Sequence, residues 1–356
     1  MLSTIDWLLI TVYFASVVGL GIHFGRKQKD SRRYFLGTGR IPGWAVGISM
    51  FSTIISSWAF IALPGKSFQS DLQYLMAIAA TPIAVWITVR YLIPIYRKKI
   101  RLSAYEYLEK RFGLPARLYG NLAFLIVHFG KMGAILYLLC LAISSITGWD
   151  IYLLIVLVGA ATLLYTWVGG IEGVIWTDVI QGLLLLASGL LALFFILGQS
   201  PGGAARVVDA AWSAGKLKLF SFEGGWESAN TIVLFFFGLN YYLQKYVSDQ
   251  TVVQRFLLSS TTRKAGRALW TSTGFIISVW ILFMLLGALL WSFYELQPGL
   301  LPADLQQAPD KAVPYFIGQQ LPAGIRGIIL AGLLAATMST LSSDLNSLAS
   351  IVTEDY

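Results

Sequence analysis

The chain has 356 residues, of which 56% are hydrophobic and 12% are charged, and its formal net charge is +8. A soluble globular domain carries about twice this charged fraction, and uncharged runs long enough to cross a bilayer recur along the whole chain. The composition therefore excludes a soluble domain with a single membrane anchor and predicts an all-α polytopic membrane protein. Cys140 is the only cysteine, which excludes an intrachain disulfide.

Nine segments are predicted to be transmembrane helices, because about 20 apolar residues span the hydrocarbon core. They are residues 5–25, 41–63, 72–96, 118–146, 150–169, 173–198, 228–247, 269–294 and 325–352. The first segment lacks a basic region before it and a small-residue cleavage site after it. We therefore interpret it as a retained helix and not as a signal peptide.

Basic residues gather in alternate connections between these segments. Lys and Arg number six in 26–40, seven in 97–117 and four in 255–267, but three in 200–227 and one in 295–324. The positive-inside rule then places the three basic loops and Tyr356 in the cytoplasm and the N-terminus outside. Because the charge follows topology and no motif or aromatic interleaving accompanies it, we expect no nucleic-acid partner.

Residues 51–58, FSTIISSW, place four hydroxyl side chains in the middle of an uncharged run. Two interpretations remain open. Ser and Thr can bond across packed membrane helices or back to their own carbonyl groups. Alternatively, the helix is broken here, and freed backbone carbonyl groups hold Na⁺ while freed amide groups hold an anion.

A second group of hydroxyl side chains lies in the last predicted span, in residues 335–347, AATMSTLSSDLNS. Helical spacing places one set of small residues on a shared face: Ala336, Ser339, Thr340, Ser343 and Ser347. Such a face either packs closely against a neighbouring helix or supplies oxygen ligands to a hard cation.

Ionisable residues also lie within the spans. Asp178 and Asp344 are each either a wetted residue at a helix end or a carboxylate that faces the interior. Lys131 lies about 13 residues from the nearer span end, roughly 20 Å, which is too far for its side chain to reach the interface. It needs an anionic partner, either Asp178 or a solute carboxylate. His128, one turn away, is interpreted as a packed neutral residue and not as a proton relay.

Residues 239–255, LNYYLQKYVSDQTVVQR, interrupt the seventh predicted span with polar and aromatic side chains. These side chains either line a cavity or form a wetted end of the span; they are Asn240, Tyr241, Tyr242, Gln244 and Lys245. Asp249 is expected to cap the short helix that follows.

Taken together, these stretches resemble the sodium–solute symporter family. The matching segments are YFLGTGRIPGWAVGISMFSTIIS (34–56), SAYEYLEKRFG (103–113), YTWVGGIEGVIWTDVIQ (165–181), SDQTVVQR (248–255) and AATMSTLSSDLNS (335–347). The resemblance implies an inverted repeat of two five-helix units behind an extra N-terminal helix. Residues 1–40 would hold that helix and a basic cytoplasmic loop, 41–198 the first repeat, and 228–356 three helices of an incomplete second repeat. On this plan the chain is a fragment of a longer transporter, and we expect it to transport poorly on its own.

The resemblance also implies two sodium sites. The main site would use the carbonyl groups of Ser52, Ile55 and Ala336 and the hydroxyl groups of Ser339 and Thr340. A second site, which only some members have, would use Asp178, Thr340, Ser342 and Ser343. The match departs from the family at Ile54, where several members carry a polar residue.

For the solute, the resemblance is to sialic acid transporters and their bacterial relatives, which have Arg at the position of Lys131. The side chains that it implies as solute contacts are Ser56, Ser57, Tyr74, Lys131 and Asn240. Ala59 and Ile78 replace a hydroxyl and an amide of those relatives, and Lys lacks the bidentate fork that Arg offers to a carboxylate. An anionic solute is therefore expected. Glucose and galactose are disfavoured, because Trp58 and Ala59 occupy two of the sugar-contacting positions.

The predicted function is sodium-coupled secondary active import of a sugar acid, such as sialic acid, or of a monocarboxylate through the bacterial inner membrane. The coupling ion would be Na⁺, with one ion per cycle or two if the second site is used. No covalent chemistry is expected, because the sequence contains no phosphate loop, metal cluster or nucleophile–base pair. A symporter of neutral sugars or polyols, a symporter-like solute sensor and a channel remain as alternatives.

Overall fold

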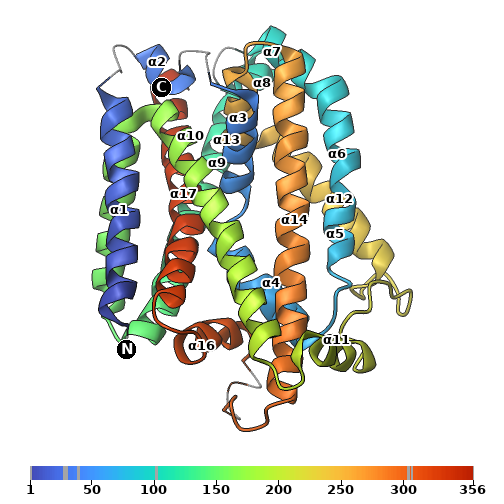
Figure 1. The fold of residues 1–356 in the computed structure, drawn as a ribbon. Coiled ribbons are helices and arrows are strands. Elements are labelled where there is room, and N and C mark those ends of the chain that lie inside the picture. The colour runs from blue at the N-terminus through green and yellow to red at the C-terminus, as the bar shows by residue number, and fades with distance from the viewer. Residues whose placement is uncertain are drawn as a thin grey trace.

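The computed structural model describes residues 2–26, 31–37, 41–100, 103–302, 305 and 308–355, and all regular structure within them is helical (Figure 1). The elements are α1 (Thr4–Gly25), α2 (Ser31–Leu36), α3 (Gly43–Ile54), α4 (Ser57–Gln69), α5 (Leu75–Ala79), α6 (Thr81–Ile87), the π-helix η1 (Thr88–Leu92), α7 (Ile93–Lys99), α8 (Glu106–Phe112), α9 (Leu114–Thr147), α10 (Ile151–Gln199), α11 (Gly203–Ser213), α12 (Thr231–Ser248), α13 (Gln250–Leu258), α14 (Thr262–Glu295), the 3-10 helix η2 (Pro309–Lys311), α16 (Ala312–Gln319) and α17 (Ile325–Asp355). Some residues that entered the topology prediction lie outside the described ranges: Lys27, Lys29, Arg40, Arg101 and Tyr356.

Within the described residues, six helical segments are long and apolar enough to cross a membrane: α1, the run Leu75–Lys99 made of α5 to α7, α9, α10, α14 and α17. The bent pair of α3 and α4 makes a seventh candidate if it is one span. The 49-residue α10 contains both of the predicted spans 150–169 and 173–198. Its two halves join at Gly170, whose φ of 57° and ψ of −164° are not helical. Glycine adopts this conformation readily because it has no Cβ atom. The chain is thus a multi-pass membrane protein, and the number of nine spans stays a prediction.

The helices form one bundle, in which α17 is the most deeply buried of the candidate membrane spans. In Figure 1, α1, α10 and α17 lie on one side, α5, α6, α12 and α14 lie on the other, and α3 and α4 run between them. In α17, 83% of the most apolar stretch is buried, against 28% in α1. A helix that is buried on nearly all sides contains polar residues only where protein groups or ions bind to their polar atoms. The hydroxyl-rich face of α17 therefore lies at the core.

The segment FSTIISSW is a broken helix, as the second interpretation of the sequence predicted. α3 ends at Ile54 and α4 begins at Ser57, and the two helix axes differ by 62°. Ile55 and Ser56 between them have extended backbone, with ψ values of 123° and −178°. The Ser56 side chain accepts the backbone N–H of Trp58 at 3.3 Å and so caps α4. The break leaves carbonyl groups of α3 without intrahelical partners in the middle of the bundle.

Candidate functional site

The last turn of α3 and the middle of α17 bring a set of uncharged oxygen atoms together. The Ser339 hydroxyl lies 3.0 Å from the carbonyl oxygen of Ser52 and 3.1 Å from that of Ala336. The Thr340 hydroxyl lies 3.3 Å from the carbonyl oxygen of Ile55 and 3.2 Å from that of Ala336. All five residues are buried. These are the five residues that the resemblance to the family implied for the main sodium site, and we call them the oxygen cluster.

The oxygen cluster has the chemistry of a site for a hard cation. Such cations prefer oxygen ligands, and Ca²⁺, which Na⁺ nearly matches in size, takes them at about 2.3–2.6 Å. Oxygen atoms that already lie 3.0 to 3.3 Å apart can surround an ion of this size after small movements. A hydroxyl group that donates to a carbonyl oxygen can also turn its lone pairs toward a cation. The cluster contains no formal charge.

Asp178 on α10 lies next to the cluster in a separate, charged arrangement. Its Oδ2 atom accepts hydrogen bonds from the Ser49 hydroxyl at 2.6 Å and from the Arg255 guanidinium at 2.9 Å. Arg255 also donates to the Ser343 hydroxyl at 2.6 Å, and both charged side chains are fully buried. Of the two partners considered for Lys131, Asp178 is therefore excluded, because Arg255 from α13 pairs with it.

The four residues implied for a second sodium site are neighbours, but they do not all point to one place. The Ser343 hydroxyl is 3.4 Å from Oδ2 of Asp178. Ser342 donates instead to the carbonyl oxygen of Ser339 at 3.0 Å, and Thr340 belongs to the oxygen cluster. Oδ1 of Asp178 has no hydrogen-bond partner among the described residues. The second site stays a prediction.

Lys131 on α9 begins a row of alternating charges, which we call the charge chain: Lys131, Asp344, His128, Asp249 and Lys245. The ammonium group of Lys131 lies 2.9 and 2.8 Å from the two carboxylate oxygens of Asp344 on α17. Asp344 also lies 2.8 Å from Nδ1 of His128. Nε2 of His128 lies 3.4 Å from Asp249, which in turn pairs with Lys245. Asp344 thus faces the interior, as one of its two interpretations held.

The charge chain is also part of the backbone architecture. Asp249 accepts the backbone N–H of Thr251 at 2.9 Å and caps α13, which confirms the predicted role. Asp344 lies four residues, or about one helical turn, after Thr340 of the oxygen cluster. Residues of α17 therefore belong to both the charge chain and the oxygen cluster.

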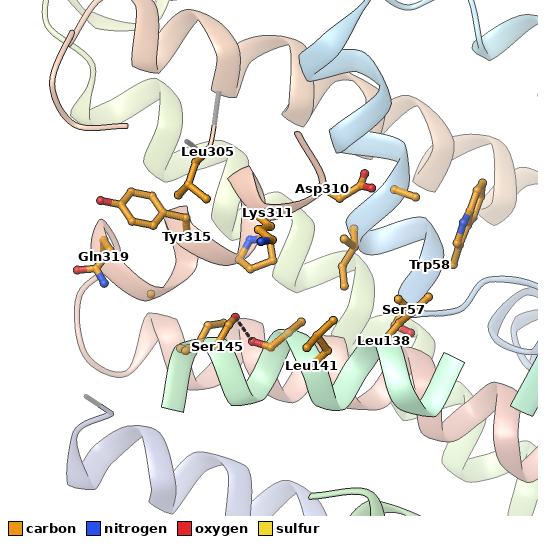
Figure 2. A pocket seen from close by; sticks show the side chains of 16 residues that line it. Ser57, Trp58, Leu138, Leu141, Ser145, Leu305, Asp310, Lys311, Tyr315 and Gln319 are labelled. Atoms are coloured by element: carbon orange, nitrogen blue, oxygen red, sulfur yellow. Dashed lines mark hydrogen bonds between the residues drawn. The ribbon is translucent and has the colours of Figure 1, made fainter. Parts of the chain in front are cut away.

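Two cavities flank the break. The smaller, of about 330 Å³, is lined mainly by aromatic and aliphatic side chains of α4, α5, α12 and α14, with Ser56 and Tyr74 on its wall. The larger, of about 580 Å³, lies between α4, α9, η2 and α16. Figure 2 shows Ser57 on α4 at one end of the larger cavity and Tyr315 on α16 at the other, with α9 along one side.

The implied solute contacts are divided between these places. Ser56 and Tyr74 line the smaller cavity and Ser57 the larger, whereas Lys131 and Asn240 line neither. Asn240 is exposed on α12, while its neighbours Tyr241 and Tyr242 line the smaller cavity. The Ser57 hydroxyl is fully buried and has no hydrogen-bond partner among the described residues.

Comparisons with known proteins agree with this geometry. Residues 34–356 match the sodium:solute symporter family. The chain belongs to this family. It is 36% identical to the sodium/sialic acid symporter SiaT of Proteus mirabilis (strain HI4320) over 99% of this chain and 71% of the relative. It is 35% identical to the sodium/sialic acid symporter NanT of Aliivibrio fischeri (strain ATCC 700601 / ES114), over 99% of this chain and 70% of the relative.

A solved structure of a Na⁺-coupled sialic acid symporter, in a substrate-bound outward-open state, superposes with a TM-score of 0.94 at 36% identity. The match covers 99% of this chain and 73% of the other. The symporter described here is therefore a sodium-coupled transporter of a small solute, and Na⁺ is its coupling ion. The family and these relatives are transporters.

The sequence analysis of this symporter did not single out Arg255. It also left Asp344 with two interpretations, one at a helix end and one in the interior. Arg255 had been counted among the basic residues of a cytoplasmic loop, but it is completely buried. A usable signal was present, because an interior carboxylate at Asp178 requires a cationic partner. The apolar residues Val252, Val253 and Phe256 around Arg255 also indicate a buried helix face.

Proposed function

We propose that this symporter imports an anionic sugar acid, with sialic acid as the first candidate, together with Na⁺. The observation that carries the proposal is the convergence of the oxygen cluster at the break between α3 and α4. The family and the identity to two sialic acid symporters support the solute class. Lys131, a cation in the interior of the bundle that lies beside α17, supports the negative charge of the solute.

Na⁺ would be held by the carbonyl groups of Ser52, Ile55 and Ala336 and the hydroxyl groups of Ser339 and Thr340. The ion would replace hydroxyl-to-carbonyl hydrogen bonds by ion–oxygen contacts between α3 and α17. Its binding would fix the end of α3 and with it the start of α4, where the solute cavities begin. Sodium binding would in this way order the solute site.

A second Na⁺ would bind at the unpartnered Oδ1 of Asp178, together with Ser343. Ser342 and Thr340 would have to turn away from the carbonyl groups that they now contact. Arg255 would stay on Oδ2 and share the carboxylate with the ion. The stoichiometry of two ions depends on this rearrangement.

The solute carboxylate would bind to the hydroxyl groups of Ser56 and Ser57, which line different cavities, and to Lys131, which lines neither and would have to turn from Asp344 toward them. The start of α4 offers the positive end of a helix dipole, which favours an anion. Tyr74 would contact the ring of the solute in the smaller cavity, and Asn240 on α12 would approach from the opposite side. Lys131 is held by Asp344 when no solute is present, so the solute must compete with an internal carboxylate.

We further infer that the chain crosses the bacterial inner membrane nine times. The spans would be α1, the α3–α4 pair, α5 to α7, α9, the two halves of α10, α12, α14 and α17. α1 would be the extra helix, residues 41–198 the first repeat and 228–356 the start of the second. The N-terminus would lie outside and the end of α17 in the cytoplasm; the two ends lie at opposite ends of the bundle in Figure 1.

The test is uptake of radiolabelled sialic acid, a monocarboxylate and glucose into proteoliposomes, with and without a Na⁺ gradient. We expect sialic acid to accumulate only with the gradient, and Lys131→Ala to abolish at least nine-tenths of this uptake. Loss of a charge-assisted hydrogen bond of about 1.5–3 kcal/mol weakens binding by roughly tenfold or more. Lys98→Ala, which removes an exposed lysine of α7, is the matched control and should be unchanged. Accumulation of glucose by both variants would contradict the anionic solute and leave sodium coupling in place.

A further inference from the structure

The imidazole of His128 has an unusual position in the charge chain. Both ring nitrogens face carboxylates: Nδ1 lies 2.8 Å from Asp344 on α17 and Nε2 lies 3.4 Å from Asp249 at the start of α13. The ring is buried and stacks on Phe124, with 3.8 Å between the ring centres. The imidazole is thus clamped between two acidic groups from different helices and has little room to turn away.

The protonation state of His128 decides whether this arrangement is favourable. A neutral imidazole carries one N–H donor and one bare nitrogen, whereas the imidazolium form donates from both nitrogens. Ionised carboxylates only accept. With a neutral ring, one nitrogen lone pair would face a carboxylate oxygen in a buried site, and that contact is repulsive. Only the imidazolium form satisfies both neighbours.

The other charged groups near His128 are compatible with a protonated imidazole. The ionisable groups around the ring are Asp344 on α17, Asp249 and Arg255 on α13 or at its start, Lys245 on α12, Lys131 on α9 itself and Tyr105 on α8 behind Phe124. Among the described residues, α4, α10 and α16 bring no ion pair to His128. Within the charge chain, the two lysines balance the two carboxylates. A proton on His128 therefore adds a net positive charge, which an anion can balance.

We propose that His128 is a proton-binding site, and that anionic solute binds at Lys131 together with a proton on His128. This inference rests on the proposed function, because it assumes a carboxylate at Lys131. Asp344 is shared by Lys131 and His128. When Lys131 turns to the solute carboxylate, Asp344 keeps only His128 as a cationic partner. Proton and anion thus stabilise each other's binding, as linkage between two sites requires.

The proton comes from a solvent hydronium ion: its O–H bond breaks and leaves a water molecule, and one N–H bond forms at the bare ring nitrogen. Release of the solute on the other side of the membrane lets Lys131 return to Asp344. Asp344 then has Lys131 as its cationic partner again, so the imidazolium form of His128 is no longer favoured and gives its proton back to water. The symporter would accordingly carry a proton with Na⁺ and the anion.

A direct test uses the fact that the chain has only two histidines, His23 and His128. Nitrogen-15 NMR of histidine-labelled protein in lipid nanodiscs, at saturating Na⁺, resolves two imidazoles, and His23→Gln assigns them. We expect the imidazolium fraction of His128 to rise when sialic acid is added between pH 7 and 9. A ring that stays neutral down to pH 5.5, or one whose state ignores bound sialic acid, overturns the inference.

Binding affinity gives the second arm of the test. The acid stays ionised from pH 5.5 to 9, since free carboxyl groups titrate near pH 4. In the alkaline part of this range we expect the dissociation constant of sialic acid to rise by up to tenfold per pH unit. His23→Gln should keep this slope and His128→Gln should lose it. A slope that survives in a folded His128→Gln protein contradicts the inference. Absence of sialic acid binding at every pH contradicts the proposed function instead, and the NMR titration of the ligand-free protein still tests the proton site.

Discussion

The oxygen cluster and the charge chain both include residues of α17, but the cluster is made of neutral groups and the chain of ionisable side chains. The oxygen cluster gathers backbone carbonyl and hydroxyl groups and has no formal charge. The charge chain and the Arg255–Asp178 pair beside it are made of ionisable side chains, in which each lysine or arginine lies against a carboxylate. A buried charge without a partner costs several kcal/mol. The comparison shows how a protein can keep charged residues at its centre and still leave a nearby cation site free.

The difference has a functional consequence. An ion that binds to neutral oxygens is held by dipoles and can leave again, because no buried counter-charge remains behind. In the charge chain, by contrast, a charged group that loses its ion-pair partner needs a new partner of opposite charge. In the function proposed above, sodium would therefore be exchanged at the oxygen cluster at low cost, whereas an anionic solute at Lys131 would have to displace Asp344 from its partner.

The largest effect is expected from breaking a buried charge pair. Arg255→Met leaves the Asp178 carboxylate fully buried without its cation, and removal of one partner of such a pair costs about 3–5 kcal/mol. Thermal and chemical unfolding in detergent should both show a marked loss of stability. The double variant with Asp178→Asn removes both charges and should be clearly more stable than Arg255→Met alone. Equal stability of the single and double variants would show that the pair is not the reason for the loss.

The same comparison explains how much the sequence could predict. The five residues of the oxygen cluster were identified through the resemblance to the family, because the local patterns alone left two interpretations open. FSTIISSW is compatible with helix packing and with the break that the structure shows at Ile55 and Ser56. The contact between α3 and α17 joins residues 287 positions apart, and no local pattern predicts it.

The partners in the charge chain could not be predicted in this way. Lys131 pairs with Asp344, more than two hundred residues further along the chain, and Asp178 pairs with Arg255. From the sequence alone, each lysine or arginine can pair with any carboxylate at the same membrane depth. The choice depends on the rotation of α9, α13 and α17 about their axes, which packing decides. For this reason the sequence left the partner of Lys131 open and did not point to Asp344.

The next largest effect should fall on sodium affinity. Thr340→Val keeps the shape of the side chain but removes the hydroxyl that reaches Ile55 and Ala336. If this oxygen contacts the ion, its loss costs about 1.5–3 kcal/mol, so the Na⁺ concentration for half-maximal binding should rise roughly tenfold or more. Thr337→Val is the matched control, because Thr337 is equally buried on α17 but its hydroxyl contacts only Leu333. A similar rise in both variants would mean that general packing, and not an oxygen ligand, sets the sodium affinity.

The smallest effect is expected at Ser57, and it separates solute contact from stability. The Ser57 hydroxyl is buried at the larger cavity without a partner among the described residues, so Ser57→Ala removes an unsatisfied group and should leave the unfolding temperature unchanged or slightly higher. If the hydroxyl instead bonds to the solute carboxylate, one hydrogen bond of about 0.5–1.5 kcal/mol is lost, and sialic acid binding should weaken by roughly two- to tenfold. Ser67→Ala on the same helix removes a buried hydroxyl that donates to Leu63 and Pro64, and it should leave solute affinity unchanged. Equal affinity of the Ser57→Ala and wild-type proteins would remove Ser57 from the solute site and leave the anion to Lys131 and Ser56, so the charge chain would then supply most of the recognition.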